Sequence, residues 1–318
     1  MKLGVLTVLL HEMQADEAFA YLHSLGVQTV ELGTGGWTNP CHCDPEILLQ
    51  DESKLEALKE SLKKNELTIS ALSCHGNGVH PNAQIAAADH RAFEQTCRLA
   101  QKLGVKTIVT FSGCPGDCPQ SQHPNWVVGG ASGAGEILDY QWNQVLIPYW
   151  KRCVAFAKQY GVERIGLELH PGFCVYNPAT LKKLREAVDP MIGVNFDPSH
   201  LIWQGMDPSA ALLELKGMVY HFHAKDTKID VANNAKNGVL NIADSYADRS
   251  WSFRTIGYGT SLEDWKRMMS TLQLIGYDGA ISIEHEDALM SVREGLEKAV
   301  EFLKQVIITE QPAAQWWV

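Results

Sequence analysis

Short apolar runs alternate with segments of helical periodicity along most of this chain of 318 residues. Apolar residues in the helical segments recur every three or four positions, which is typical of helices with one buried face. The strand-like runs are 2–10, 27–33, 67–75, 105–113, 164–170, 191–197, 219–226 and 279–287. The helical segments are 16–26, 52–65, 89–104, 144–161, 177–188, 207–217, 262–276 and 291–307.

Eight strands, each followed by a helix, predict an α/β fold of the (β/α)₈ TIM-barrel type. The alternative is a doubly wound open sheet, which usually has a glycine-rich phosphate-binding turn after its first strand. Here the first strand runs into "LLHEMQADE", which has no such turn. Since no linker or shift in composition interrupts the pattern, we expect a single domain over 1–318.

Two connections are long, 113–143 after the fourth strand and 226–260 after the seventh. Both follow the carboxyl ends of strands, and in a barrel this is the functional face. Loops of this length at that face are usually lids or walls of a substrate site.

The bulk properties argue against several classes of partner. The formal net charge of −10 disfavours nucleic acid, and no apolar run is long enough to span a bilayer. The amino terminus has no signal-peptide pattern, so we expect a cytoplasmic protein with reduced thiols among its eight cysteines. The spacing of Cys41, His42 and Cys43 with Cys114 and Cys118 matches no common zinc module.

Four consecutive strands end in side chains that can bind a metal, namely Glu168, Asp197, His223 and Glu284. Strand ends of a barrel converge on one pocket, where three carboxylates would repel one another unless a cation joined them. Three oxygens and one nitrogen suit one divalent ion, with Mn²⁺, Mg²⁺ or Co²⁺ preferred and Zn²⁺ as an alternative. Each residue could instead be an ordinary polar strand end, and His221 competes with His223 as the nitrogen ligand.

Further polar residues are predicted to face this pocket and bind substrate: His75, His170, His200, Lys225 and Arg254. His170 and Lys225 each follow a predicted metal ligand by two residues and so share its side of the strand. The alternatives are structural, with His75 capping a loop and Arg254 in a surface ion pair.

Glu31 ends the second strand, where it could face the pocket or only tie two strand ends together. Trp37, Trp126 and Trp251 belong to rim loops. Tryptophans in such loops can stack on the face of a sugar, although more often they hold the loops down.

The motifs "GLELHPG", "NFDPSHL", "HFHAKDT" and "SIEHED" resemble, in order, those of the xylose isomerase-like TIM-barrel superfamily, which includes sugar phosphate isomerases and epimerases. The resemblance covers the whole chain and implies a Glu-Asp-His-Glu metal site on Glu168, Asp197, His223 and Glu284.

Departures from the superfamily's patterns exclude some of its activities. Endonuclease IV needs a histidine after strand four and an Asp-x-His motif before the last strand, and "TFSGCPG" and "SWSFRTIGYG" contain neither. Ketose 3-epimerases have a glutamate and an arginine where this chain has Cys174 and Ile229. Of their substrate contacts, the Asp197 and His200 pair alone is kept.

We therefore expect a metal-dependent isomerase or epimerase of an unphosphorylated sugar, keto-sugar or cyclitol, in which Glu168 and Glu284 move a proton through an enediolate. The runner-up is a lyase on a keto-cyclitol or 3-keto-sugar, similar to inosose dehydratase, and a non-catalytic sugar-binding protein is more remote. The expected partner is a small carbohydrate or cyclitol, with neither nucleic acid nor membrane, and a homo-oligomer is left open.

Overall fold

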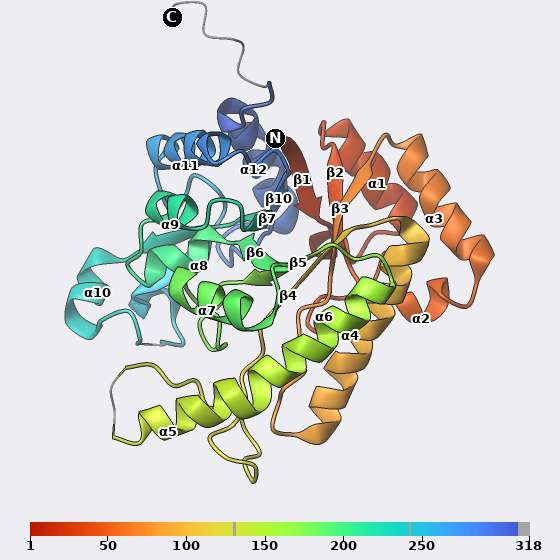
Figure 1. Cartoon of the computed structure of the whole chain (residues 1–318). Coiled ribbons are helices and arrows are strands. Elements are labelled where there is room, and N and C mark those ends of the chain that lie inside the picture. Colours follow the sequence, from red (N-terminus) through yellow and green to blue (C-terminus); the bar gives the residue numbers. More distant parts are fainter. Residues whose placement is uncertain (130–131, 242, 311–318) are drawn as a thin grey trace, which may run out of the picture.

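Eight parallel strands close into a barrel in the computed structural model, which describes residues 1–129, 132–241 and 243–310 (Figure 1). The predicted (β/α)₈ barrel is therefore confirmed. The strands are β1 (Lys2–Leu6), β2 (Thr29–Gly33), β3 (Thr68–Ser73), β4 (Thr107–Thr110), β5 (Arg164–Glu168), β6 (Ile192–Phe196), β7 (Val219–Ala224) and β10 (Ala280–Ile283). Their order around the barrel is β1-β10-β7-β6-β5-β4-β3-β2.

Helices surround the barrel, and most of the long ones begin at a residue whose polar side chain caps the helix. The main ones are α1 (Ala15–Ser24), α3 (Glu52–Lys64), α4 (Ala83–Leu103), α6 (Ile147–Gln159), α7 (Pro178–Val188), α9 (Pro208–Glu214), α11 (Leu262–Leu274) and α12 (Val292–Val306). Helix α4 starts six residues before the predicted 89, because the Asn82 side chain accepts the free N–H groups of Gln84 and Ile85.

Most of the predicted strands end earlier than expected, and two of them continue directly into another element. The run 2–10 is a strand only to Leu6, and a 3₁₀ helix, η1 (Thr7–Leu10), follows it. The run 219–226 stops at Ala224, and the chain then forms β8 (Asp226–Ile229), which pairs antiparallel with β9 (Trp251–Arg254). The second long connection is thus built around a two-stranded sheet rather than an irregular loop.

The buried Asp226 carboxylate explains why this sheet is anchored to the barrel. It accepts hydrogen bonds from the backbone N–H groups of Gly257, Gly259 and Thr260 and from the indole N–H of Trp265. A carboxylate with this many donors is well stabilised without a cation beside it.

Both long connections lie at the lower end of the barrel in Figure 1, opposite the amino terminus. The first connection carries α5 (Ala134–Asp139) and a π-helix, η2 (Tyr140–Leu146), before α6. The second connection carries α10 (Val231–Asn237) and a short 3₁₀ helix, η3 (Tyr246–Asp248). Residues 130–131 and 242 of these connections, and 311–318 of the predicted domain, lie outside the described residues. The remaining short helices are α2 (Pro45–Leu48) and α8 (Pro198–Trp203).

The strand register shifts at two points, between Val30 and Glu31 on β2 and between Val194 and Asn195 on β6. Such irregularities re-aim side chains and are frequent next to active sites. Here Glu31 and Asn195 are fully buried, and they form hydrogen bonds with His223 and Glu168, respectively. The bulges therefore belong to the construction of that polar site.

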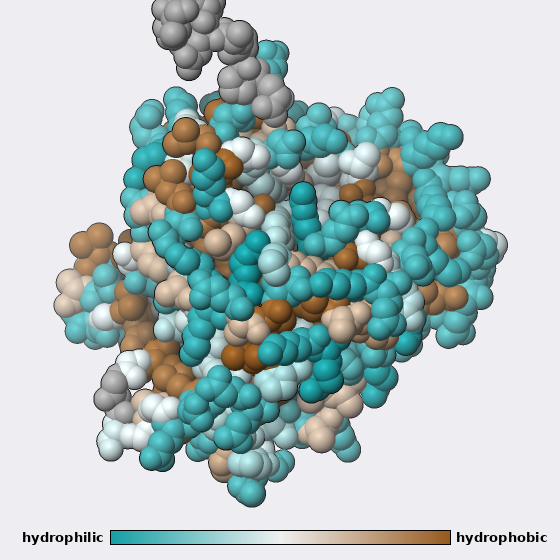
Figure 2. Space-filling view, in the orientation of Figure 1, coloured by the Kyte–Doolittle hydropathy of each residue, from teal (hydrophilic) through white to brown (hydrophobic). Residues whose placement is uncertain are grey.

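The outer surface is mostly hydrophilic on the face shown in Figure 2, with smaller hydrophobic patches between. Among the described residues, no helix is both long and apolar enough to cross a membrane.

Candidate metal centre and active site

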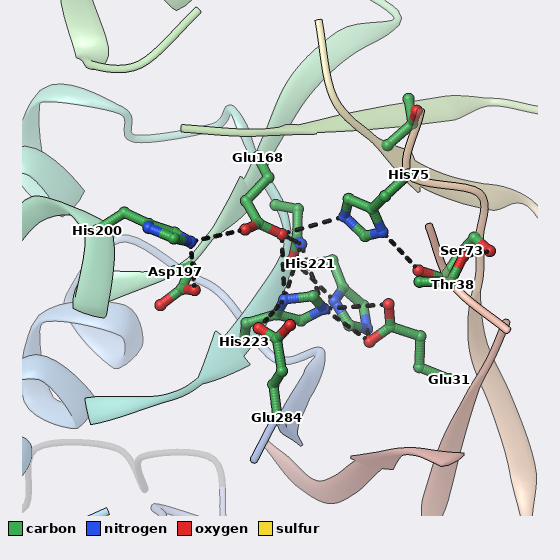
Figure 3. Close-up of polar contacts among 12 residues, drawn as sticks. Glu31, Thr38, Ser73, His75, Glu168, Asp197, His200, His221, His223 and Glu284 are labelled. Carbon is green, nitrogen blue, oxygen red and sulfur yellow. Dashed lines mark hydrogen bonds and ion pairs between the residues drawn. The ribbon is translucent and has the colours of Figure 1, made fainter. Parts of the chain in front are cut away.

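The carboxyl ends of β5, β6, β7 and β10 bring the four predicted metal ligands together. One ligand atom from each of Glu168, Asp197, His223 and Glu284 lies within 4.8 Å of all the others. Figure 3 shows their polar atoms turned toward a common centre. The first three side chains are buried, and Glu284 is the most exposed of the four at 18%.

Two carboxylate oxygens of this cluster accept no hydrogen bond from the described residues. Asp197 caps α8 through Oδ1, which accepts the Ser199 N–H at 2.8 Å, and so its Oδ2 points to the cluster. Neither Asp197 Oδ2 nor Glu284 Oε2 has a hydrogen-bond partner among the described residues, although both are buried. Since buried carboxylate oxygens need a compensating partner, these two fit a cation.

Lys225 is the cation that the chain itself supplies. Its Nζ lies 3.0 Å from Asp197 Oδ2 and 2.9 Å from Glu284 Oε2 and forms an ion pair with each. When His223 is the neutral ring that a metal ligand must be, three carboxylates, including Glu168, face this one ammonium, which leaves two negative charges. A divalent cation would neutralise them, so the donor set and the charge both fit such an ion.

The His223 ring is oriented by Glu31 on the far side of the cluster. His223 Nε2 donates to Glu31 Oε2 at 2.9 Å, while Nδ1 lies 3.0 Å from Glu284 and 3.3 Å from Glu168 (Figure 3). Histidine ligands of metals usually donate their other N–H to a carboxylate in this way. Nδ1 is therefore the atom of His223 that could bind a metal, and Glu31 fixes that tautomer.

Burial and neighbouring charges shift the pKa values of these groups in opposite directions. Burial raises the pKa of the Glu31 carboxyl, but the charges of His223 and His221 outweigh it and lower that pKa to about 2. Burial also raises the pKa of Glu284, and Lys225 and His223 reverse the effect and hold it below its ordinary value. Burial lowers the pKa of His223, whereas Glu31 and Glu284 raise it well above the ordinary value.

Glu168 is held by three further side chains. His75 Nε2 and Asn195 Nδ2 each lie 3.1 Å from its Oε2, and His200 Nε2 lies 3.1 Å from its Oε1. His200 Nε2 also lies 3.3 Å from Asp197 Oδ2. The predicted substrate-binding residues His75 and His200 therefore contact the cluster directly.

His170 lies beside the cluster without joining its ion pairs. Its ring centroid is 4.1 Å from that of His200, and its Nδ1 donates to the Pro171 carbonyl. Burial and the charge of His200 lower the pKa of His170 to about 3. The ring is therefore neutral, with Nε2 as an acceptor.

Arg254 pairs with an acidic residue outside the four predicted metal ligands. Its Nε donates to Asp287 Oδ2 at 3.0 Å, and its side chain is 18% exposed. Lys225 points into the cluster, whereas the neighbouring Asp226 accepts hydrogen bonds from backbone groups.

Sequence reasoning missed Asn195 and Glu286. Asn195 bridges Glu168 and the His221 ring, and Glu286 Oε2 lies 3.2 Å from Lys225 Nζ. Each stands two residues from a predicted ligand, so strand alternation could have found both. His221 instead lies toward the barrel interior, where its Nε2 lies 3.2 Å from Ser70 Oγ.

All eight cysteines are free thiols in the described part of the chain. His42 Nε2 donates to the Met13 carbonyl at 3.0 Å, so His42 has a structural partner. The polar clusters found in the described residues that could hold a metal consist of glutamate, aspartate and histidine.

Comparison with known proteins identifies the family. The family described as xylose isomerase-like TIM barrel matches residues 19–306. The chain belongs to this family. Among its relatives is the uncharacterized protein YfiH of Bacillus subtilis (strain 168), which is 38% identical over 312 residues, 96% of this chain and 99% of that protein.

Two other proteins are similar to this chain at lower identity. The inosose dehydratase of Geobacillus thermodenitrificans (strain NG80-2) is 25% identical over 139 residues, 43% of this chain and 45% of that protein. The crystal structure of IOLI protein with a bound zinc atom has a TM-score of 0.66 at 19% identity, and covers 96% of each chain. At that identity the structural likeness shows the common fold alone.

Proposed function

We propose that this protein is a divalent-metal-dependent enzyme that isomerises or epimerises a sugar, keto-sugar or cyclitol by proton abstraction through an enediolate. The observation that carries the proposal is the buried cluster of Glu168, Asp197, His223 and Glu284, with two oxygens free of hydrogen bonds. The zinc in the IOLI structure is further support for a metal. Three oxygen donors favour Mn²⁺, Mg²⁺ or Co²⁺, with Zn²⁺ as the alternative.

The bound ion would polarise adjacent carbonyl and hydroxyl oxygens of the substrate and so acidify the C–H between them. Glu168 and Glu284 are the proton-transfer residues in this proposal. Their carboxylates are ionised because nearby His and Lys groups hold their pKa values low despite burial. Glu168 is oriented by His75 and His200, whereas the partly exposed Glu284 can reach the substrate directly.

The remaining predicted residues would bind and orient the substrate. His200 and Lys225 lie next to both acidic ligands and could donate to substrate oxygens. His170 offers an acceptor nitrogen at the side of the cluster. Arg254, held through Nε by Asp287, would donate from its terminal nitrogens.

A lyase is the second candidate function. It shares the proton abstraction and then expels a leaving group instead of returning the proton. Two observations favour it: the chain has Cys174 and Ile229 where ketose 3-epimerases have substrate contacts, and it matches an inosose dehydratase over 139 residues. His200 would then protonate the leaving group.

The experiment that tests the function follows solvent deuterium. The metal-loaded protein is first screened by NMR for binding to keto-sugars and keto-cyclitols, and each bound compound is then incubated in D₂O. An isomerase or epimerase gives a rearranged product with carbon-bound deuterium, and a lyase gives an unsaturated product. Binding of a keto-sugar with neither outcome would indicate a binding protein and refute both enzymatic proposals.

We also propose a cytoplasmic location. The free thiols of all eight cysteines support it, because a reducing compartment keeps thiols unpaired.

A further inference from the structure

A cavity of about 320 Å³ opens beside the metal cluster, and the proposed function leaves it without a role. Its lining includes Trp37, His80, Asp89, His170 and Phe173. His170 also belongs to a polar cluster with Glu168 and His200, whose ligand atoms lie within 4.8 Å of one another. A molecule held at the metal cluster can therefore extend past His170 into this cavity.

Trp37 is the most distinctive residue of the cavity, because its side chain is 67% exposed and yet well supported. Its ring lies 5.2 Å from Phe111 and 5.6 Å from Phe173, and those two phenylalanines stack at 4.3 Å. Phe111 also packs against His75 at 4.5 Å, and His75 is hydrogen-bonded to Glu168. A continuous aromatic wall thus runs from the cluster out to the exposed indole.

The turn that carries Trp37 is rigidly built. Gly36 has a φ of +65°, and a Cβ there would lie 2.0 Å from the His75 carbonyl oxygen, so this position needs glycine. The Trp37 N–H donates to the same carbonyl. The Thr38 hydroxyl lies 2.7 Å from the carbonyl oxygens of both Gly35 and Ser73. Trp37 is therefore held in place before any ligand binds, which lowers the entropic cost of binding.

Polar groups accompany the indole in the cavity. His80 Nδ1 accepts the Asn82 N–H at 2.9 Å, so Nε2 is the ring nitrogen that can donate to a ligand. The Asp89 carboxylate uses Oδ2 to accept the Asn77 N–H at 2.7 Å and keeps capacity to accept more. An aromatic platform with a donor and an acceptor nearby suits a sugar ring, which has an apolar C–H face and hydroxyls at its edge.

We propose that this cavity binds a second sugar ring, so that the substrate is a glycoside whose reacting ring occupies the metal cluster. This inference rests on the proposed function for the role of the cluster. The cavity is at the small end of the range for small-molecule sites, roughly 300–1,000 Å³, and so has room for one ring. The second ring stacks on Trp37, and the glycosidic bond lies beside His170.

Binding of disaccharides to the full-length, Mn²⁺-loaded protein tests this assignment. The probes are maltose, cellobiose and trehalose, with methyl α-D-glucopyranoside as the single-ring comparison, and binding is measured by calorimetry and saturation-transfer NMR. We expect the wild type to bind at least one disaccharide at least tenfold more tightly than the single ring. Trp37→Ala should remove that preference, and Trp37→Phe should keep most of it.

The control variant is Leu274→Ala on α11, which removes a side chain that is 72% exposed and lies outside the cavity lining. It should bind every probe as the wild type does. A wild type without preference for any disaccharide overturns the proposal, and so does an unchanged preference in Trp37→Ala.

The two proposals fail in different ways. Trp37-dependent binding of a disaccharide without any solvent exchange would retain the second-ring site and reject the enzymatic function. Exchange into a single-ring sugar with no disaccharide preference would retain the function and reject the site.

Discussion

Replacing Glu31 by glutamine tests the orientation of the metal-ligating histidine. Glu31 is fully buried and accepts hydrogen bonds from His223 Nε2 and Ser282 Oγ, both at 2.9 Å. His223 Nε2 also lies 3.0 Å from Glu31 Oε1, so glutamine keeps the shape but places its NH₂ group against this N–H in either orientation of the amide. The His223 tautomer that presents Nδ1 to the cluster then loses its fixed partner.

Removing such an outer carboxylate typically weakens metal affinity about 10- to 100-fold. We therefore expect the Kd of Glu31→Gln for Mn²⁺ to rise by that factor, which corresponds to about 1.4–2.7 kcal/mol. The kcat should return to within a few-fold of wild type at saturating metal, because Glu31 touches His223 and not the substrate. Calorimetric titration with Mn²⁺ and kcat against metal concentration measure both quantities.

Glu163→Gln is the matched control. Glu163 pairs with Lys106 at 3.3 Å on the exposed surface before β5, far from the cluster, and its loss should leave the Kd for metal unchanged. A Kd for Glu31→Gln within twofold of wild type would contradict the orienting role. So would a loss of kcat that excess metal does not restore, since that result would give Glu31 a direct part in the chemistry.

The other predictions concern four sites. Glu284→Gln should keep the fold and abolish turnover, because an amide cannot act as a base; a kcat like that of wild type would remove Glu284 from proton transfer. His223→Ala should lower the metal content found by elemental analysis, and equal content in both proteins would rule out this ligand. Arg254→Ala should reduce kcat/KM at least tenfold, whereas the control Arg249→Ala, a change in the same connection, should not. A loss of kcat/KM within twofold for Arg254→Ala, about 0.4 kcal/mol in transition-state binding, would leave Arg254 with a structural role. Asp226→Asn should lower the stability by at least about 2 kcal/mol, since it breaks hydrogen bonds to buried N–H groups, and an unchanged Tm would contradict that account.

Local pattern was enough to predict the barrel and the four clustered residues. Strand alternation has a period of two and helices a period of 3.6, so apolar spacing along the chain indicates each element without knowledge of the others. Once eight parallel strands close, their carboxyl ends must meet, and Glu168, Asp197, His223 and Glu284 then face one site. Asn195 stands two residues before Asp197 and so shares its side of the strand, but the sequence analysis did not predict its role.

Contacts between residues far apart in the chain decided the rest. The β8–β9 sheet depends on Asp226, whose partners lie more than thirty residues away, and no local periodicity records such hydrogen bonds. The sequence could not identify the partner of Arg254 for the same reason, because Asp287 lies 33 residues further along the chain. The sequence could not show whether Trp37 stacks on a sugar or holds its loop down. The turn that places Trp37 depends on the contact between Gly36 and the distant His75 carbonyl. Such choices depend on which groups meet when the barrel closes, and only the tertiary structure brings those groups together.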